Sequence, residues 1–83
     1  MTKRQAIKLI KGELKRAKKL YPIWPRDKIH AAAIVAEEAG ELVRAANDHE
    51  RPGENKDEGD TRIRMQIEAI QTAAMCLRFL MGR

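Results

Sequence analysis

Apolar residues recur at steps of three and four positions in three segments of this chain, which is the spacing of one helix face. In the first segment, residues 3–20, Thr2 followed by Gln5 is typical of a capping-box start. Pro22 and Pro25 end that helix and predict a rigid extended connector, because residues before proline avoid helical backbone. The apolar stripe of this first helix consists of Ile7, Ile10, Leu14, Ala17 and Tyr21.

The second and third segments predict two longer helices. The second is expected to begin at Asp27, a favourable N-cap, and to run to about residue 47. Its first half, residues 29–36, is small and apolar nearly all round, which indicates burial by neighbours on several sides. The third is expected over residues 61–81, with Gly82 as its C-terminal stop. No strand-like alternation is present, so the predicted fold is all-α, with three helices.

Between these helices, residues 48–60 contain six acidic residues together with Pro52, Gly53 and Gly59. We expect an acidic loop here, which is long for a compact helical protein. Loops of this length serve either as the mobile rim of a site or as a plain connector. The sequence leaves both interpretations open.

The chain has 83 residues, which is one domain with little capacity to bury a core. Cys76 is its only cysteine, so no internal disulfide can compensate. We therefore expect a homo-oligomer, most simply a homodimer, in which the second and third helices of two chains complete a bundle. No apolar run is long enough to span a bilayer or resembles a signal peptide, which predicts a cytoplasmic protein without a membrane partner.

The positive charge is concentrated at the N-terminus. Eight lysines and arginines against Glu13 give residues 1–20 a net charge of +7, and the remaining residues sum to −2. Such a segment can bind nucleic acid, an anionic membrane surface or polyphosphate, or it can be a solvated helix face. Nucleic acid is the less favoured partner, because no recognition-helix pattern and no interleaved aromatic residues accompany the charge.

Two helices each carry an acidic or amide pair at helical spacing. Glu38 and Glu41 lie three residues apart and leave the same helix face, and Glu68 and Gln71 repeat that spacing on the third helix. Buried carboxylates are costly unless they are paired or bind a metal, and hard cations such as Mg²⁺ take oxygen ligands. These four residues therefore predict a metal site. The alternative is that each glutamate faces solvent or pairs with an arginine: Arg44, Arg64 or Arg78.

Residues 37–41, Glu-Glu-Ala-Gly-Glu, fit the EExxE motif of MazG-like nucleotide pyrophosphohydrolases. Residues 68–71, Glu-Ala-Ile-Gln, stand where that family has its second motif, ExxD, after a tolerated spacing. The chain resembles this family over about residues 24–80, and the resemblance implies a single MazG-like helical domain. Such enzymes cleave nucleoside triphosphates between the α and β phosphates, giving the monophosphate and pyrophosphate.

The resemblance also implies roles for individual residues. Glu38, Glu41 and Glu68 would bind Mg²⁺, or alternatively Mn²⁺, with Gln71 as a weak or water-mediated contact. Glu37 would position or deprotonate the attacking water, or else pair with Arg44 or Lys28. Trp24 would stack on a base or pack over a helix end. Candidates for binding the phosphates are Lys28, Arg62, Arg64 and Arg78, among which the sequence does not choose.

One residue departs from the family pattern, since Gln71 stands where the second motif has aspartate. Its amide oxygen can ligate Mg²⁺ but carries no charge. One alternative is therefore a degenerate member that binds nucleotide without hydrolysing it. Another is a non-enzymatic helical dimer that binds nucleic acid or another polyanion through residues 3–19. Phosphoribosyl-ATP pyrophosphohydrolase, a relative with the same carboxylate scheme, also ends its second motif in aspartate.

Overall fold

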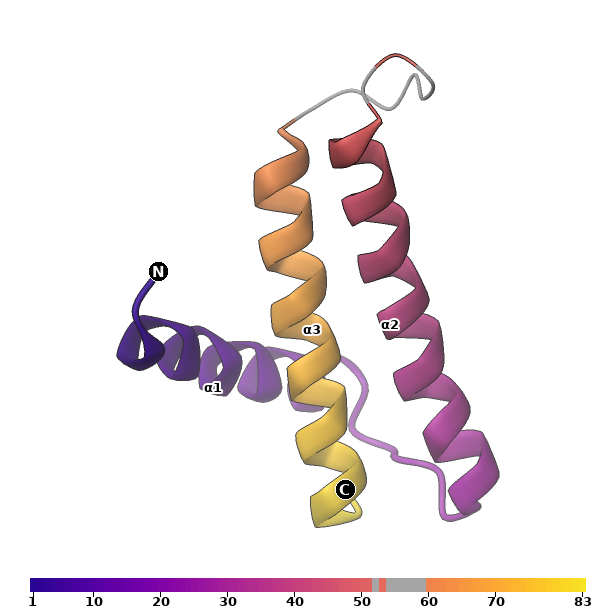
Figure 1. Ribbon diagram of the computed structural model, residues 1–83. Coiled ribbons are helices and arrows are strands. Elements are labelled where there is room, and N and C mark those ends of the chain that lie inside the picture. Colours follow the sequence, from indigo (N-terminus) through magenta and orange to yellow (C-terminus); the bar gives the residue numbers. More distant parts are fainter. Residues whose placement is uncertain (52, 54–59) are drawn as a thin grey trace.

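The computed structural model describes residues 1–51, 53 and 60–83, which form three α-helices and no strand (Figure 1). The helices are α1, Lys3–Leu20, α2, Lys28–Glu50, and α3, Thr61–Met81. The predicted all-α fold with three helices is confirmed for these residues. None of the described helices is both long enough and apolar enough to cross a membrane.

Side-chain and glycine caps define the helix ends. Thr2 Oγ1 accepts a hydrogen bond from the Gln5 amide, and Gln5 Oε1 accepts one from the Thr2 amide, which is the predicted capping box. Asp27 accepts from the Ile29 amide at the start of α2, as predicted. Gly82 ends α3 with a φ of 74°, a left-handed conformation that glycine adopts without strain.

The end of α2 differs from the prediction, because the helix continues to Glu50 instead of ending near residue 47. Asp48 is 4% exposed and forms an ion pair with Arg64 of α3, with 3.0 Å between Oδ2 and Nη2. His49 Nδ1 lies 2.7 Å from Thr61 Oγ1. These contacts join the two helices, so residues 48–50 belong to the hairpin and not to the predicted acidic loop. Residues 52 and 54–59 of that loop lie outside the described residues.

The antiparallel helices α2 and α3 form a hairpin, and α1 crosses it (Figure 1). Helix α1 packs against α3 and not against α2. The connector from α1 to α2 is held to the last turns of α3, because Arg78 Nη2 donates a hydrogen bond of 2.8 Å to the Tyr21 carbonyl. Helix α1 and the connector therefore lie against the α3 side of the hairpin.

Few large side chains are buried where the helices meet. Within the described part of the chain, the buried apolar residues are all alanines: Ala17, Ala31, Ala45 and Ala74. Twelve large apolar residues are exposed, including Ile23 at 88%, Ile29 at 81% and Leu80 at 79%. The radius of gyration is 13.8 Å, against about 12 Å expected for a compact domain of this length. A single subunit thus leaves most of its large aliphatic side chains uncovered.

Candidate metal centre

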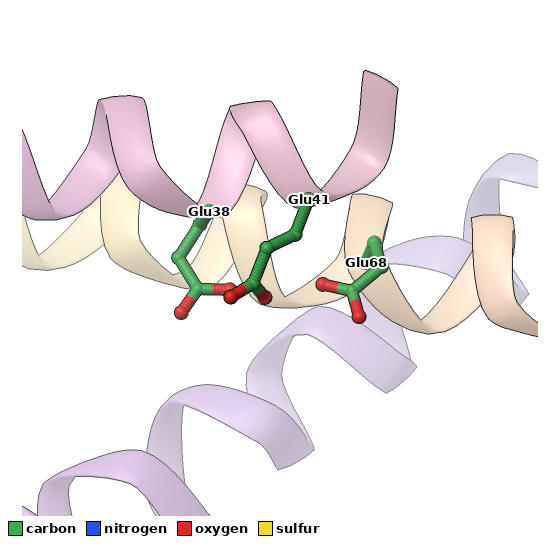
Figure 2. A group of neighbouring side chains, drawn as sticks. All are labelled: Glu38, Glu41 and Glu68. Atoms are coloured by element: carbon green, nitrogen blue, oxygen red, sulfur yellow. The ribbon is translucent and has the colours of Figure 1, made fainter. Parts of the chain in front are cut away.

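Three glutamates from two helices converge at the middle of the hairpin. Figure 2 shows the side chains of Glu38 and Glu41 leaving α2 and that of Glu68 leaving α3, with their carboxylates turned toward one another. One carboxylate oxygen from each lies within 4.8 Å of the others. Buried Ala45 and Ala74 leave little bulk between the two helices, which favours close approach of the helix axes.

Two oxygens of this cluster lack hydrogen-bond donors. Oε2 of Glu38 and Oε2 of Glu68 are buried and accept no hydrogen bond from any described residue. A buried polar atom without a partner is expensive, and a carboxylate oxygen more so. A divalent cation held by oxygen ligands would supply the missing partner for both atoms. The donor set therefore fits a hard cation.

Burial and neighbouring negative charges raise the pKa values of two glutamates in this cluster. Burial raises the pKa of Glu38, and the negative charges of Glu41, Glu37 and Glu13 raise it further. Burial is also the main cause that raises the pKa of Glu68, followed by a hydrogen bond with Glu41. Both glutamates therefore hold protons more tightly than an ordinary carboxyl when no cation is bound.

Arg64 brings positive charge to the α3 side of the cluster. It lowers the pKa of Glu68, against the larger effects that raise it. The same guanidinium forms the ion pair with Asp48, whose side chain is almost fully buried. Of the arginines that could have paired with the glutamates, Arg78 bonds a backbone carbonyl instead. Ion pairing with Arg64 thus accounts for Asp48, while Oε2 of Glu38 and Oε2 of Glu68 accept no hydrogen bond from a described residue.

A pocket of about 730 Å³ adjoins the cluster through Glu38, whereas Glu41 and Glu68 do not line it. All three helices and the connector contribute to its wall, and in Figure 2 α1 passes opposite the three carboxylates. Gln71 and Glu37 both line this pocket together with Glu38. Gln71 is half-buried, whereas Glu37 is exposed at the rim.

Arg78 and Trp24 line the same pocket and contact each other. The guanidinium carbon of Arg78 lies 4.8 Å from the centre of the Trp24 ring, and the side chain is 2% exposed. Burial lowers the pKa of Arg78. Its Nε is buried and bonds no described residue. The structure thus places two predicted substrate residues in one pocket wall.

The remaining predicted phosphate residues lie elsewhere. Lys28 is exposed at the first position of α2, and Arg62 is exposed near Asp60, with 3.9 Å between charged atoms. Neither lines the pocket beside the carboxylates. Arg64 lies beside Glu68 but is not part of the pocket wall either.

Sequence reasoning missed the contribution of α1. Glu13 lines the pocket, and its charge contributes to the raised pKa of Glu38. Arg16 holds Glu13 through two hydrogen bonds of 2.8 Å. A signal was present, since Glu13 is the one acidic residue in a strongly basic helix and precedes Leu14 of the apolar stripe. His30 also lines the pocket.

Comparison with known protein families, curated proteins and solved structures finds no match to this chain. The resemblance to MazG-like pyrophosphohydrolases therefore stays a prediction that rests on residues 37–41 and 68–71. The geometry of the three glutamates stands independently of that resemblance.

Proposed function

We propose that this chain is a Mg²⁺-dependent pyrophosphohydrolase that converts nucleoside triphosphates to monophosphates and pyrophosphate. The observation that supports it most is the convergence of one carboxylate oxygen each from Glu38, Glu41 and Glu68 within 4.8 Å, with two buried oxygens that accept no hydrogen bond from a described residue. Carboxylate oxygens in this number suit Mg²⁺ or Mn²⁺, which keep further positions for water and phosphate. A magnesium centre beside an open pocket is the basis of phosphoryl chemistry in many enzymes.

In this proposal Glu38, Glu41 and Glu68 hold the cation, and the amide oxygen of Gln71 gives a weaker contact. The bound cation would neutralise phosphate charge and make water more acidic. Glu37 is suited to accept a proton from that water, because it is exposed at the pocket rim and adjacent to Glu38. These residues would orient the water toward the phosphate chain.

The neighbouring pocket would hold the nucleotide. Its volume of about 730 Å³ lies within the range of small-molecule sites, roughly 300–1,000 Å³. Arg78 supplies positive charge in the wall, and Arg64 supplies it beside Glu68. Trp24 would offer a base the ring face that Arg78 leaves open. Lys28 is the weakest of the predicted phosphate residues, because it lies outside this wall.

We propose further that the active species is a homodimer in the cytoplasm. A surface of α2 and α3 residues is almost entirely apolar and open, and it consists of Ala32, Val35, Cys76, Phe79 and Leu80. A second copy of the chain packed on this surface would bury the side chains that one subunit leaves exposed. The single thiol would stay reduced in the cytoplasm.

The test is pyrophosphate release from a panel of nucleoside triphosphates, with Mg²⁺, with Mn²⁺ and with chelator. We expect equal amounts of monophosphate and pyrophosphate, only when a cation is present. Glu41→Gln should abolish release, whereas Glu50→Gln, an exposed carboxylate at the end of the same helix, should retain it. Release of orthophosphate would contradict the proposal. Cation-dependent nucleotide binding without turnover would instead favour the degenerate alternative that Gln71 suggests.

A further inference from the structure

Helix α1 carries a continuous basic stripe that the carboxylate site does not use. The stripe consists of Arg4, Lys8, Lys11, Lys15 and Lys19, at steps of four, three, four and four residues. At about 100° of rotation per residue, all five fall within an arc of roughly 80° on the helix surface. All five are exposed, and at 1.5 Å per residue they extend over about 22 Å.

The stripe makes no polar side-chain contact with the rest of the described chain. Within the described part of the chain, none of its five residues forms an ion pair or a side-chain hydrogen bond. Like charges at this spacing repel by a few tenths of a kcal/mol per pair. Helix α1 packs on α3 through a different face, which carries Leu14 and buried Ala17. The stripe is therefore a destabilising feature that a partner of opposite charge would offset.

The first half of the stripe borders a depression in the protein surface. Side chains of successive turns of α1 leave about 450 Å³ of open space between them, lined by Lys3, Arg4, Ile7, Lys8 and Lys11. Ile7 is 42% exposed and lines the groove between the cations. This is a shallow, positively charged surface that matches an extended anion better than a compact one.

We propose that the basic stripe of α1 binds the phosphate backbone of duplex nucleic acid, independently of base sequence. A duplex carries one negative charge per 1.7 Å of axis, so about 22 Å of it holds about 13 phosphates on its two strands, and the five cations would meet those on the side that faces α1. Lysine amines contact phosphates as point charges and read no base pattern, which favours binding without sequence preference. The proposal does not depend on the metal centre, because no stripe residue lines its pocket.

Two other anionic partners fit the surface less well. An anionic membrane needs a wide apolar helix face free to insert between lipids. The middle of the apolar stripe of α1 packs on α3, and only Ile7 and Tyr21 of the stripe are exposed. Single-stranded nucleic acid is held largely by base stacking on aromatic side chains, and residues 3–20 contain none. Apart from Ile7, the surface along the stripe offers charge, which suits a regular array of phosphates.

The test is fluorescence anisotropy of two labelled 20-base-pair duplexes of unrelated sequence, titrated with the full chain at 50 and 200 mM salt. The stripe variant combines Lys8→Gln, Lys11→Gln and Lys15→Gln. Glutamine has nearly the helix propensity of lysine, so α1 should persist, which circular dichroism can verify.

The matched control variant combines Arg26→Gln, Arg51→Gln and Arg83→Gln, which removes the same charge from exposed positions outside α1. We expect both duplexes to bind alike. Three phosphate contacts account for about a fortyfold change in affinity between the two salt concentrations. The affinity of the stripe variant should therefore fall about fortyfold less than that of wild type between 50 and 200 mM salt, and the affinity of the control should fall as much as that of wild type.

Three results would overturn the proposal. Equal weakening of the two variants would show an effect of net charge alone. Tighter binding to an unpaired oligonucleotide than to either duplex would point to single strands. Binding to phosphatidylserine vesicles, without binding to duplexes, would identify a membrane surface as the partner.

Discussion

The guanidinium of Arg78 lies 4.8 Å above the Trp24 ring while its Nη2 donates to the Tyr21 carbonyl. One side chain of α3 thus holds the connector in two ways, through its flat face and through its edge. This places Trp24 in the pocket wall and fixes the path from α1 to α2.

We expect Arg78→Lys to destabilise the protein by about 1–3 kcal/mol. A lysine keeps the charge, but it cannot stack on the ring and donate to the carbonyl at once. Urea unfolding measures the change, and Trp24, the only tryptophan, reports it by fluorescence. Arg83→Lys, at the exposed C-terminus, is the control and should leave the free energy of unfolding unchanged. Equal stability of both variants would show that the Arg78 contacts contribute nothing.

Adding Mg²⁺ or Mn²⁺ should raise the melting temperature, because a ligand bound only by the folded state stabilises it. At a cation concentration of 100 times Kd the gain is about 2.7 kcal/mol, or more than about 10 °C for a domain of this size. Glu38→Gln and Glu41→Gln should each remove the shift and leave the cation-free protein at least as stable. Glu50→Gln should retain it. Unfolding of both site variants without cation would indicate structural ion pairs instead.

The raised pKa values of Glu38 and Glu68 predict how cation-free stability depends on pH. A raised carboxyl pKa means that the folded state binds more protons than the unfolded chain does. This contribution is fully present below the ordinary glutamate pKa of about 4.3 and is lost as pH rises through the raised values.

Melting wild type and Glu38→Gln from pH 4 to pH 8 in chelator isolates this effect from other titrating groups. We expect the variant to gain stability relative to wild type as pH rises, because its amide cannot ionise. A constant difference across this range would mean that Glu38 titrates no differently in the folded and unfolded chains.

Local patterns predicted much of the fold, since the capping box at Thr2 and the stop at Gly82 depend on residues within one turn. The convergence of Glu38 and Glu41 follows from helical spacing in the same way. The predicted end of α2 near residue 47 was wrong, because an aspartate followed by proline and glycine resembles the start of a loop. Asp48 lies in the helix and forms an ion pair with Arg64, sixteen positions later in the chain. Where a helix ends is decided here by a contact between segments that are distant in the sequence.

The contribution of α1 to the site escaped prediction for a similar reason. Glu13 lies close to the carboxylates only because α1 crosses the hairpin on the side to which they turn (Figure 2). Burial of Arg78 likewise depends on a backbone carbonyl of the connector, a group that no side-chain motif records. Crossing geometry arises from packing of whole helices, which spacing along one helix does not determine.

The uncovered apolar surface of α2 and α3 predicts that Leu80→Lys disrupts the proposed homodimer. Leu80 is 79% exposed in one subunit and lines the apolar surface, so a charge there would be buried only in the assembly. Light scattering at micromolar concentration should show dimers for wild type and monomers for the variant. Leu9→Lys, on exposed α1, is the control. A stable folded wild-type monomer would contradict the homodimer.

Gln71 determines whether the proposed cation site has a fourth charged ligand or a neutral amide at this position. It follows Glu68 by three residues, so both leave the same face of α3, and it lines the pocket with Glu38. If it contacts the cation, Gln71→Asp adds a charged ligand that is one methylene shorter. We expect tighter Mg²⁺ binding and pyrophosphate release at least equal to that of wild type, because a charged oxygen is the better partner for a hard cation.

The same substitution has the opposite effect if Gln71 only completes a polar wall. A new half-buried carboxylate beside Glu38 and Glu68 would then be destabilising by about 1–3 kcal/mol, with no compensation from metal. Titration calorimetry with Mg²⁺ and melting curves, on wild type and on Gln71→Asp, separate the two outcomes. Gln71→Glu serves as the control, because it adds the charge and keeps the length of the side chain. Lower melting temperatures for both variants, with unchanged affinity for Mg²⁺, would remove Gln71 from the proposed cation site.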